Sequence, residues 1–312
     1  MRILCLASRL PYPPDRGDRL RAFHFLEHLS REHELHLVSF IADPAEHKHV
    51  EALRAYCAQV RVILMDARRS ALSAAINVWR REPLQALYYR SSAMARLIEA
   101  MVRDGGYDAA YVHLFRMAPY LAAAKDLYRI VDLTDVISQE VSRSLPYQDA
   151  VWRLIYRLDG PRIERYERVV AETFEETWLI SRADRDLLAA ACPGSNIRVV
   201  TNGVDLEKLA PTGEPAQADS LIFVGHLRVF HNVDAVTHLV QDILPRVLDR
   251  VPGCRLTIVG ADPGPAVRRL EKDPAVRVVG FVPDLNHCLN SAAVFVAPLR
   301  FAAGVQNKVL EA

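Results

Sequence analysis

The sequence predicts an α/β protein made of two Rossmann-like domains, each built on a parallel sheet. Apolar strand-like runs alternate with amphipathic helical segments along the chain, which is the pattern of parallel α/β layers. The pattern stops at 209–219, a small, polar and proline-containing segment, and then restarts. A length of 312 residues also suits two domains better than one. We therefore predict a first domain at 1–208, a linker at 209–219 and a second domain at 220–312.

The first domain is predicted to begin with a buried strand at 2–7, which is followed by a proline-rich break. The next helix has an apolar face formed by Leu20, Phe23, Leu26 and Leu29. Further strands are expected at 35–41, 60–65, 108–113, 129–133, 177–181 and 197–200. Further helices are expected at 47–57, 71–80, 92–103, 147–174 and 182–191.

The second domain is predicted to repeat this topology without repeating the sequence. Strands are expected at 220–224, 255–259, 276–279 and 293–297, and helices at 233–248, 265–272 and 284–289. Pro298 and a small-residue turn centred on Gly304 follow the last strand, and another helix begins near Val305. Because an open sheet of this type usually continues further, we expect the second domain to be truncated and the chain to be a fragment or a truncated reading frame.

Composition excludes several broad classes. Half of the residues (51%) are hydrophobic and 25% are charged, as in ordinary globular proteins, and the net charge of +1 gives no general attraction to nucleic acid. The five cysteines are dispersed with no C-x-x-C spacing, which favours reduced thiols in the cytoplasm. The first residues predict a strand rather than a signal peptide, and no apolar run approaches the roughly 20 residues that span a bilayer.

Two glycine loops follow strands and precede helices, where an open α/β sheet binds ligands. Gly17 would allow close backbone approach, while Asp18 could cap the helix. The alternative there is a plain helix cap with solvated charges. The second loop starts at Gly225, with His226 and Arg228 behind it, and its alternative is a simple left-handed turn.

Acidic and histidine side chains mark the ends of two other predicted strands. Asp132, Asp135 and Glu140 come close together in the sequence, and we expect one of these carboxylates to face the interdomain cleft. His113 ends a strand and is a catalytic candidate, although a lone histidine there is more often structural. Asp132 and Asp135 are three residues apart and do not form a D-x-D pair, and no metal site is predicted.

The terminal stretch combines a strand, a glycine turn and a helix start, which together present N–H groups to an anion. It also carries a carboxylate, Glu311, about two turns into the helix. Elsewhere, the arginines next to Trp79 are either a contact for anionic lipid or an ordinary solvated helix face.

Taken together, the motifs resemble glycosyltransferase family 4 in their order and spacing. The segments are Asn202-Gly-Val-Asp205, Phe223-Val-Gly-His-Leu227, Ile258-Val-Gly260, Val279-Gly-Phe-Val282 and Gly304-Val-Gln-Asn-Lys-Val-Leu-Glu-Ala312. The resemblance implies the GT-B fold, in which two Rossmann-like domains face a cleft. It also implies retaining transfer from a nucleotide-sugar, without a metal or other cofactor. The segments 11–19, 23–24, 232–236 and 298–300 are similar to sugar transferases of exopolysaccharide and PEP-CTERM systems.

The resemblance also assigns roles to individual residues. Gly17 would approach the donor phosphate and the acceptor, and Gly225 would open the loop below the donor diphosphate. Phe281 and Val282 would lie beside the nucleobase, and Glu311 would bind the ribose hydroxyls.

The chain departs from the family pattern in its charges. Ala303 replaces the first glutamate of the E-x7-E motif, and His226 and His231 replace the usual arginine and lysine. The positive charge that binds the diphosphate would then come from Arg300 and Lys308, together with the N–H groups after Gly304.

These arguments yield two sets of candidate residues. The catalytic candidates are Gly17, Asp18, His113 and Asp135. The donor-binding candidates are Gly225, His226, Arg228, Phe281, Val282, Arg300, Gly304, Val305, Lys308 and Glu311.

The function implied is a hexosyltransferase-type glycosyltransferase that acts on a glycan or lipid-linked acceptor in exopolysaccharide synthesis. Its expected location is the cytoplasm, either free or peripheral to the inner membrane, with no nucleic-acid partner. Two alternatives come from other classes of protein. One is a catalytically inactive GT-B-like binding or assembly protein, suggested by Ala303 and the two histidines. The other is a dinucleotide-dependent oxidoreductase, against which the lack of G-x-G-x-x-G counts.

Overall fold

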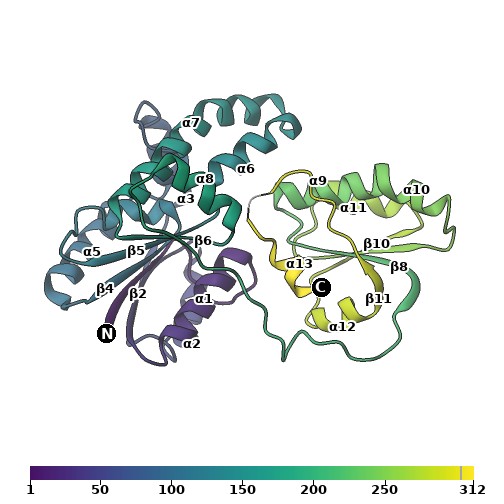
Figure 1. Ribbon diagram of the computed structural model, residues 1–312, viewed down its shortest axis with the longest axis horizontal. Helices are drawn as coiled ribbons and strands as arrows, with labels where there is room; N and C mark the ends of the chain where they lie inside the picture. Colours follow the sequence, from purple (N-terminus) through teal and green to yellow (C-terminus); the bar gives the residue numbers. More distant parts are fainter. Residues whose placement is uncertain (303) are drawn as a thin grey trace. The chain divides into compact units, whose positions relative to one another are not determined.

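The computed structural model describes residues 1–302 and 304–312, and the chain divides into two compact units. The first unit comprises 1–145 and 149–201, and the second comprises 146–148 and 202–312. Each unit is an α/β layer structure around its own parallel sheet (Figure 1). The residues 202–208, which we assigned to the first domain from the sequence, group with the second unit.

The first unit contains a seven-stranded parallel sheet with the order β3-β2-β1-β4-β5-β6-β7. The strands are β1 (Arg2–Ala7), β2 (Glu34–Ile41), β3 (Gln59–Leu64), β4 (Ala109–His113), β5 (Tyr128–Thr134), β6 (Glu176–Leu179) and β7 (Ile197–Val199). All of them were expected from the sequence to within a few residues. The order reverses between β1 and β4, so the ligand-binding crevice of this sheet is expected at their carboxyl ends.

The helices of this region cover both faces of the sheet (Figure 1). They are α1 (Gly17–Leu29), η1 (Pro44–His49), α2 (Val50–Leu53), α3 (Ala67–Ile76), α4 (Leu84–Tyr88), α5 (Ser92–Gly105), η2 (Phe115–Tyr120), α6 (Ile137–Ser144), η3 (Leu145–Tyr147), α7 (Ala150–Thr173) and α8 (Arg182–Ala191). The helix predicted at 71–80 begins earlier, because Asp66 caps it by accepting hydrogen bonds from the N–H groups of Arg68 and Arg69. We did not predict α6, which is short and has only two apolar residues, Ile137 and Val141, on its inward face.

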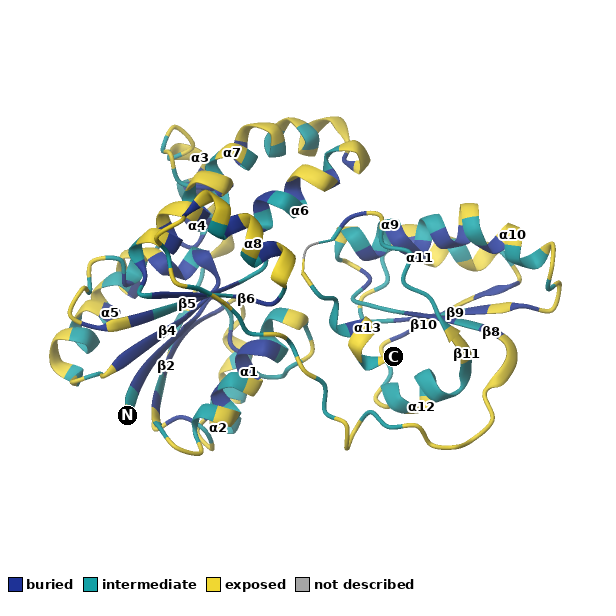
Figure 2. Ribbon diagram, viewed as in Figure 1, coloured by how far each residue is buried: buried dark blue, intermediate teal, exposed yellow. Residues whose placement is uncertain are grey.

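Alternating side chains of β1 fill two separate cores. Ile3 and Cys5 point to the face covered by α1 and α2, whereas Leu4 and Leu6 pack under α4, α5 and the end of α7. Burial on both sides explains why β1 is an unbroken apolar run rather than an alternating one (Figure 2).

The second unit contains a four-stranded parallel sheet with the order β10-β9-β8-β11. The strands are β8 (Gln217–Val224), β9 (Arg255–Val259), β10 (Val276–Gly280) and β11 (Ala292–Phe295). β8 therefore begins inside the predicted linker. The order reverses between β8 and β11, which places the expected crevice of this sheet after Val224 and after Phe295.

The helices of the second unit are α9 (Phe230–His238), η4 (Leu239–Ile243), α10 (Leu244–Leu248), α11 (Pro265–Arg268), η5 (Arg269–Lys272), α12 (Leu285–Asn290) and α13 (Asn307–Glu311). The single helix predicted at 233–248 is divided by the π-helical segment η4. Pro245 lies in the first turn of α10, and because proline has no N–H group it removes one hydrogen bond from the α pattern there. Among the described residues, no helix is long and apolar enough to cross a membrane.

Candidate functional site

The crevice of the first sheet is formed on one side by the start of α1. Arg16 precedes this helix and contributes no side-chain cap, so the cap predicted for Asp18 is wrong. Asp18 instead lies in the first turn, while the first N–H groups of an α-helix have no partner within the helix. Gly17, the first residue of α1, thus presents its N–H at the positive end of a thirteen-residue helix. This end of the helix suits an anionic group.

Asp18 is held by two arginines at this edge. Its Oδ2 lies 3.0 Å from Nη1 of Arg9 and 3.9 Å from Nη2 of Arg116. Burial alone would raise the pKa of Asp18, but the positive charges of Arg9 and Arg116 outweigh it and lower that pKa. Asp18 therefore stays ionised and positions the arginines, which argues against a role as a proton donor.

His113 lies at the end of β4 in a buried polar network. Its Nδ1 is 3.4 Å from the Tyr111 hydroxyl and 3.9 Å from Oδ2 of Asp132. Asp132 also accepts hydrogen bonds of 2.7 Å from the Tyr111 hydroxyl and from Nε of Arg21. Burial opposes ionisation of Asp132, but His113 and Arg21 lower its pKa. The network thus fixes the orientation of the His113 ring.

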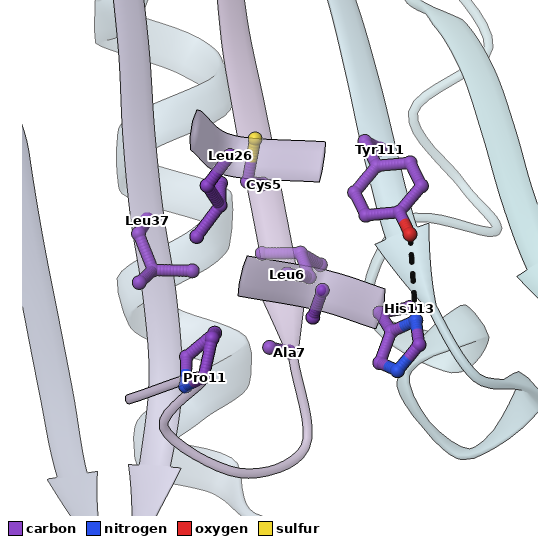
Figure 3. Close-up of a pocket in the computed structure, with 9 residues that line it drawn as sticks. Cys5, Leu6, Ala7, Pro11, Leu26, Leu37, Tyr111 and His113 are labelled. Carbon is purple, nitrogen blue, oxygen red and sulfur yellow. Dashed lines mark hydrogen bonds between the residues drawn. The ribbon is translucent and has the colours of Figure 1, made fainter. Parts of the chain in front are cut away.

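The other ring nitrogen of His113 is available to a ligand. His113 is 3% exposed, and its Nε2 has no hydrogen-bond partner among the described residues. The ring lines a small pocket with Ala7, Pro11 and Tyr111 (Figure 3). A buried imidazole nitrogen without a partner is costly unless a water or a substrate group completes it. His113 is the strongest catalytic candidate of the first unit.

Sequence analysis missed Arg21 and Tyr111, which hold this network together. Arg21 is 6% exposed although it lies on α1 between the apolar positions Leu20 and Phe23. A charged residue on the inward face of an amphipathic helix is the signal that could have identified it.

Asp135, which follows β5, has a partly unsatisfied carboxylate and lies near residues with strained backbone angles. Its Oδ1 is buried without a hydrogen-bond partner in the described part of the chain. Burial, followed by the nearby carboxylates of Asp184 and Glu140, raises the pKa of Asp135 to about 7. Thr134, just before it, and Leu114, just after His113, both have positive φ angles, of 65° and 71°. Non-glycine residues in this conformation concentrate at functional sites.

In the second unit, two glycines bring the ends of β8 and β9 into direct contact. A Cβ atom on Gly260 would lie 1.7 Å from the carbonyl oxygen of Gly225. A Cβ atom on Gly225 would lie 3.0 Å from the side chain of Asn232. Asn232 is 4% exposed, and its Nδ2 donates to the carbonyl of His226 over 3.0 Å. The predicted diphosphate loop is therefore closely packed at its base, and only glycine fits there.

Lys308 and Glu311 lie one turn apart on α13, on the same face of the helix. Lys308 is 9% exposed, its Nζ donates to Oδ1 of Asn232, and it lies 5.3 Å from the centre of the Phe223 ring. Burial lowers the pKa of Lys308 to about 8, partly offset by Glu311. Burial also raises the pKa of Glu311, while Lys308 lowers it. The structure thus joins Lys308 to the base of the Gly225 loop.

Three other charged candidates have different surroundings. Nε of Arg300 donates to Oδ2 of Asp234 over 2.9 Å, and a second guanidinium nitrogen bonds Oδ1. This forked ion pair neutralises the charge of Arg300. The pair must therefore break before the guanidinium of Arg300 can bind a diphosphate. His226 Nε2 lies 3.7 Å from Oδ2 of Asp262, and Arg228 is exposed.

The remaining donor-binding candidates lie at the carboxyl edge of the same sheet. Phe281 directly follows β10 and is 71% exposed, and Val282 is partly buried. Gly304 has a φ angle of 60°, which favours glycine, and Val305 follows it before α13. Ala303, which replaces the first glutamate of the motif, lies outside the described residues. An exposed aromatic ring at a strand end is a suitable surface for a flat base.

No group of three or more histidine, cysteine, aspartate or glutamate side chains that could hold a metal ion occurs within 1–302 and 304–312. Binding of the donor without a metal stays a prediction.

Comparison with known proteins identifies the second unit more closely than the first. Residues 218–312 match the family model described as Glycosyl transferases group 1. This match spans β8 to α13 and includes all the donor-binding candidates. No curated protein sequence matches the chain.

The whole chain is similar to several solved glycosyl-transfer enzymes. One is sucrose-phosphate synthase from Thermosynechococcus elongatus, with a TM-score of 0.70, 15% identity and coverage of 100% of this chain and 78% of that one. Another is a mutant of S. aureus TarM in complex with fondaparinux, α-GlcNAc-glycerol and UDP, with a TM-score of 0.60, 8% identity and coverage of 94% and 80%. A third is α,α-trehalose 6-phosphate synthase from Burkholderia multivorans, with a TM-score of 0.55, 11% identity and coverage of 99% and 80%.

These similarities confirm the predicted α/β fold with parallel sheets, which is that of GT-B glycosyltransferases. The family match concerns the second unit, and the solved structures show the fold.

Proposed function

We propose that the chain is a retaining, hexosyltransferase-type glycosyltransferase that moves a sugar from a nucleotide-sugar to a glycan or lipid-linked acceptor. We further propose that it acts in exopolysaccharide or cell-surface polysaccharide synthesis, in the cytoplasm and peripheral to the inner membrane. The observation that carries the proposal is the family match over 218–312, which ends on α13, where Lys308 and Glu311 share one face.

The second unit would hold the donor. Phe281 and Val282 would contact the base, and Glu311 would accept hydrogen bonds from the ribose hydroxyls. The diphosphate would lie over the loop that starts at Gly225, with Lys308 as its buried cation. The S. aureus TarM mutant bound to UDP supports a nucleotide as the ligand of this fold.

The first unit would hold the acceptor and contribute to the chemistry. Nε2 of His113 would accept or donate a hydrogen bond at a substrate hydroxyl, because Asp132 and Tyr111 fix the ring from the other side. The N–H groups at the start of α1 would face an anionic group of a substrate. Attack on the sugar carbon would then occur from the face of the leaving group, with a donor phosphate oxygen assisting the acceptor hydroxyl.

Donor binding by the Glu311→Ala variant tests this proposal. Calorimetric titration with a panel of nucleotide-sugars should show binding to the unaltered protein and a loss of at least about tenfold in the variant. Glu214→Ala, which changes an exposed carboxylate in the segment before β8, is the matched control and should bind normally. Unchanged affinity in the Glu311 variant would refute the ribose assignment.

A specific observation favours the alternative of an inactive GT-B-like binding protein. Arg300 is neutralised by Asp234, and Ala303 stands in place of a glutamate, so two of the charges expected at the donor site are paired or missing. Sugar transfer or donor hydrolysis by the purified protein would exclude this alternative. Donor binding without either reaction would favour it.

A further inference from the structure

The first two turns of α7 expose an apolar stripe where a surface helix is normally polar. Val151, Leu154 and Leu158 are 67%, 60% and 63% exposed. Their spacing of three and four residues places them on one face of the helix. The opposite side buries Asp159, while further along the helix the exposed positions become charged. Trp152, which is 50% exposed, lies on the side that Asp159 shares and adds exposed apolar surface next to the stripe.

A second exposed apolar segment consists of α3 and the turn that follows it. Leu72 and Ile76, one helical turn apart, are 61% and 62% exposed. Trp79 is 74% exposed and is the most exposed of the three tryptophans. Isolated exposed apolar residues need no explanation, but two neighbouring clusters that each contain a tryptophan do.

A backbone contact places the two segments in the same part of the first unit. The N–H of Leu84 donates to both carboxylate oxygens of Asp159, over 3.1 and 3.2 Å. Trp79 lies just before Leu84 in the chain, and Leu158 is the residue before Asp159. In Figure 2 the exposed positions of α3 and α7 lie at the same end of this unit.

The charges within these two segments are positive, although acidic residues flank them: Asp66 pairs with Arg69 over 3.3 Å, and Glu82 pairs with Arg80 over 3.4 Å. Residues 67–81 contain four arginines and no acidic residue, and residues 150–158 contain two arginines and no acidic residue. The arginines are Arg68, Arg69, Arg80, Arg81, Arg153 and Arg157. The guanidinium of Arg80 lies 5.6 Å from the ring centre of Trp79. We call the two segments, 67–81 and 150–158, the apolar–basic surface.

We propose that the apolar–basic surface binds an anionic lipid bilayer. Tryptophan and aliphatic side chains would enter the boundary between headgroups and acyl chains, and the arginines would contact lipid phosphates. Charge complementarity selects this occupant, because the six arginines outnumber Asp66 and Glu82, the acidic residues that pair with two of them. This inference rests on the peripheral location in the proposed function and names the surface that would contact the membrane. It does not depend on how the donor is bound.

Vesicle binding by the full chain tests the inference. The chain should sediment with phosphatidylcholine vesicles that contain phosphatidylglycerol, and only weakly with pure phosphatidylcholine. The double variant Trp79→Ser/Trp152→Ser should lower binding at least about tenfold, and so should Arg68→Glu/Arg81→Glu. Leu64→Ser and Arg103→Glu, at exposed positions on β3 and α5, are the matched controls and should bind normally.

Three results would overturn the inference. The first is equal binding of the tryptophan variant and the Leu64→Ser control, and the second is equal binding to anionic and neutral vesicles. The third is a dimer in lipid-free sedimentation that the tryptophan variant abolishes, since the surface would then bind a second copy of the chain. Nucleotide-sugar titration of the same variants separates this inference from the proposed function, because donor binding should stay unchanged in all of them.

Discussion

Replacement of Gly260 by alanine should destabilise the second unit strongly. The new Cβ would lie 1.7 Å from the carbonyl oxygen of Gly225, and the backbone at the two strand ends fixes the positions of both atoms. No side-chain rotation can relieve this overlap, so β8 and β9 must separate by roughly 1 Å in a closely packed sheet. The φ angle of 156° adds strain for any residue with a side chain. We expect a loss of about 3 kcal/mol or more in the free energy of unfolding.

Two other glycines provide a graded comparison. Gly225→Ala should cost about 1–2 kcal/mol, because its Cβ would meet the Asn232 side chain at 3.0 Å. Gly264→Ala is the control. No atom lies within 4 Å of its Cβ, and its φ angle of −69° suits any residue. It should be neutral or stabilise the unit by up to about 1 kcal/mol.

The assay must report on the second unit, because all three tryptophans lie in the first. Hydrogen exchange of peptides from β8 and β9, followed by mass spectrometry in increasing urea, gives the required local free energies. Tryptophan fluorescence of the same samples should show normal unfolding of the first unit. Equal stability of the Gly260 and Gly264 variants would refute the close contact between the two strand ends.

Three further predictions follow from buried charges. Burial raises the pKa of Glu167 to about 7, against the opposing effect of hydrogen bonds from Ser138. The stability that comes from its protonation is therefore present below about pH 4.5 and is lost as pH rises through 7. The loss due to Glu167 is about 3 kcal/mol in urea unfolding followed by tryptophan fluorescence, and Glu167→Gln should remove this part of the slope and leave the part that comes from Asp135. Nucleotide-sugar binding should weaken as pH rises through 8, where Lys308 loses its proton. In calorimetry, Lys308→Arg should extend binding to higher pH and Lys308→Met should weaken it throughout. Asp132→Asn should cost about 3–5 kcal/mol in urea unfolding, because Arg21 loses its buried carboxylate, and adding Arg21→Met should recover part of that loss.

Much of the fold could be predicted because each strand is a short apolar run bounded by turn residues. β1 and β9 were located to the residue, and in β1 burial on both faces requires continuous apolar side chains. The errors occur where a local contact outweighs periodicity. Asp66 starts α3 earlier than its apolar pattern does, and Pro245 divides a helix that otherwise has the right spacing.

The sequence by itself determined the strand–loop–helix units and therefore the edge at which each candidate lies. Gly17, His113 and Gly225 were chosen as candidates because ligand loops follow strands in this class of fold, whereas the family resemblance assigned the role of Glu311. The order and spacing of the segments 202–205, 223–227, 258–260, 279–282 and 304–312 indicated a glycosyltransferase family, and residues 218–312 match the model of Glycosyl transferases group 1.

Only the tertiary structure decided which side chains are partners. Asp18 pairs with Arg9 rather than capping α1, Arg300 pairs with Asp234, and Nζ of Lys308 donates a hydrogen bond to Asn232. These pairs lie far apart in the sequence or depend on side-chain direction, and no periodic pattern encodes either. The physical reason is that a buried charge needs a partner, and any nearby element can supply one once the sheet has brought the elements together.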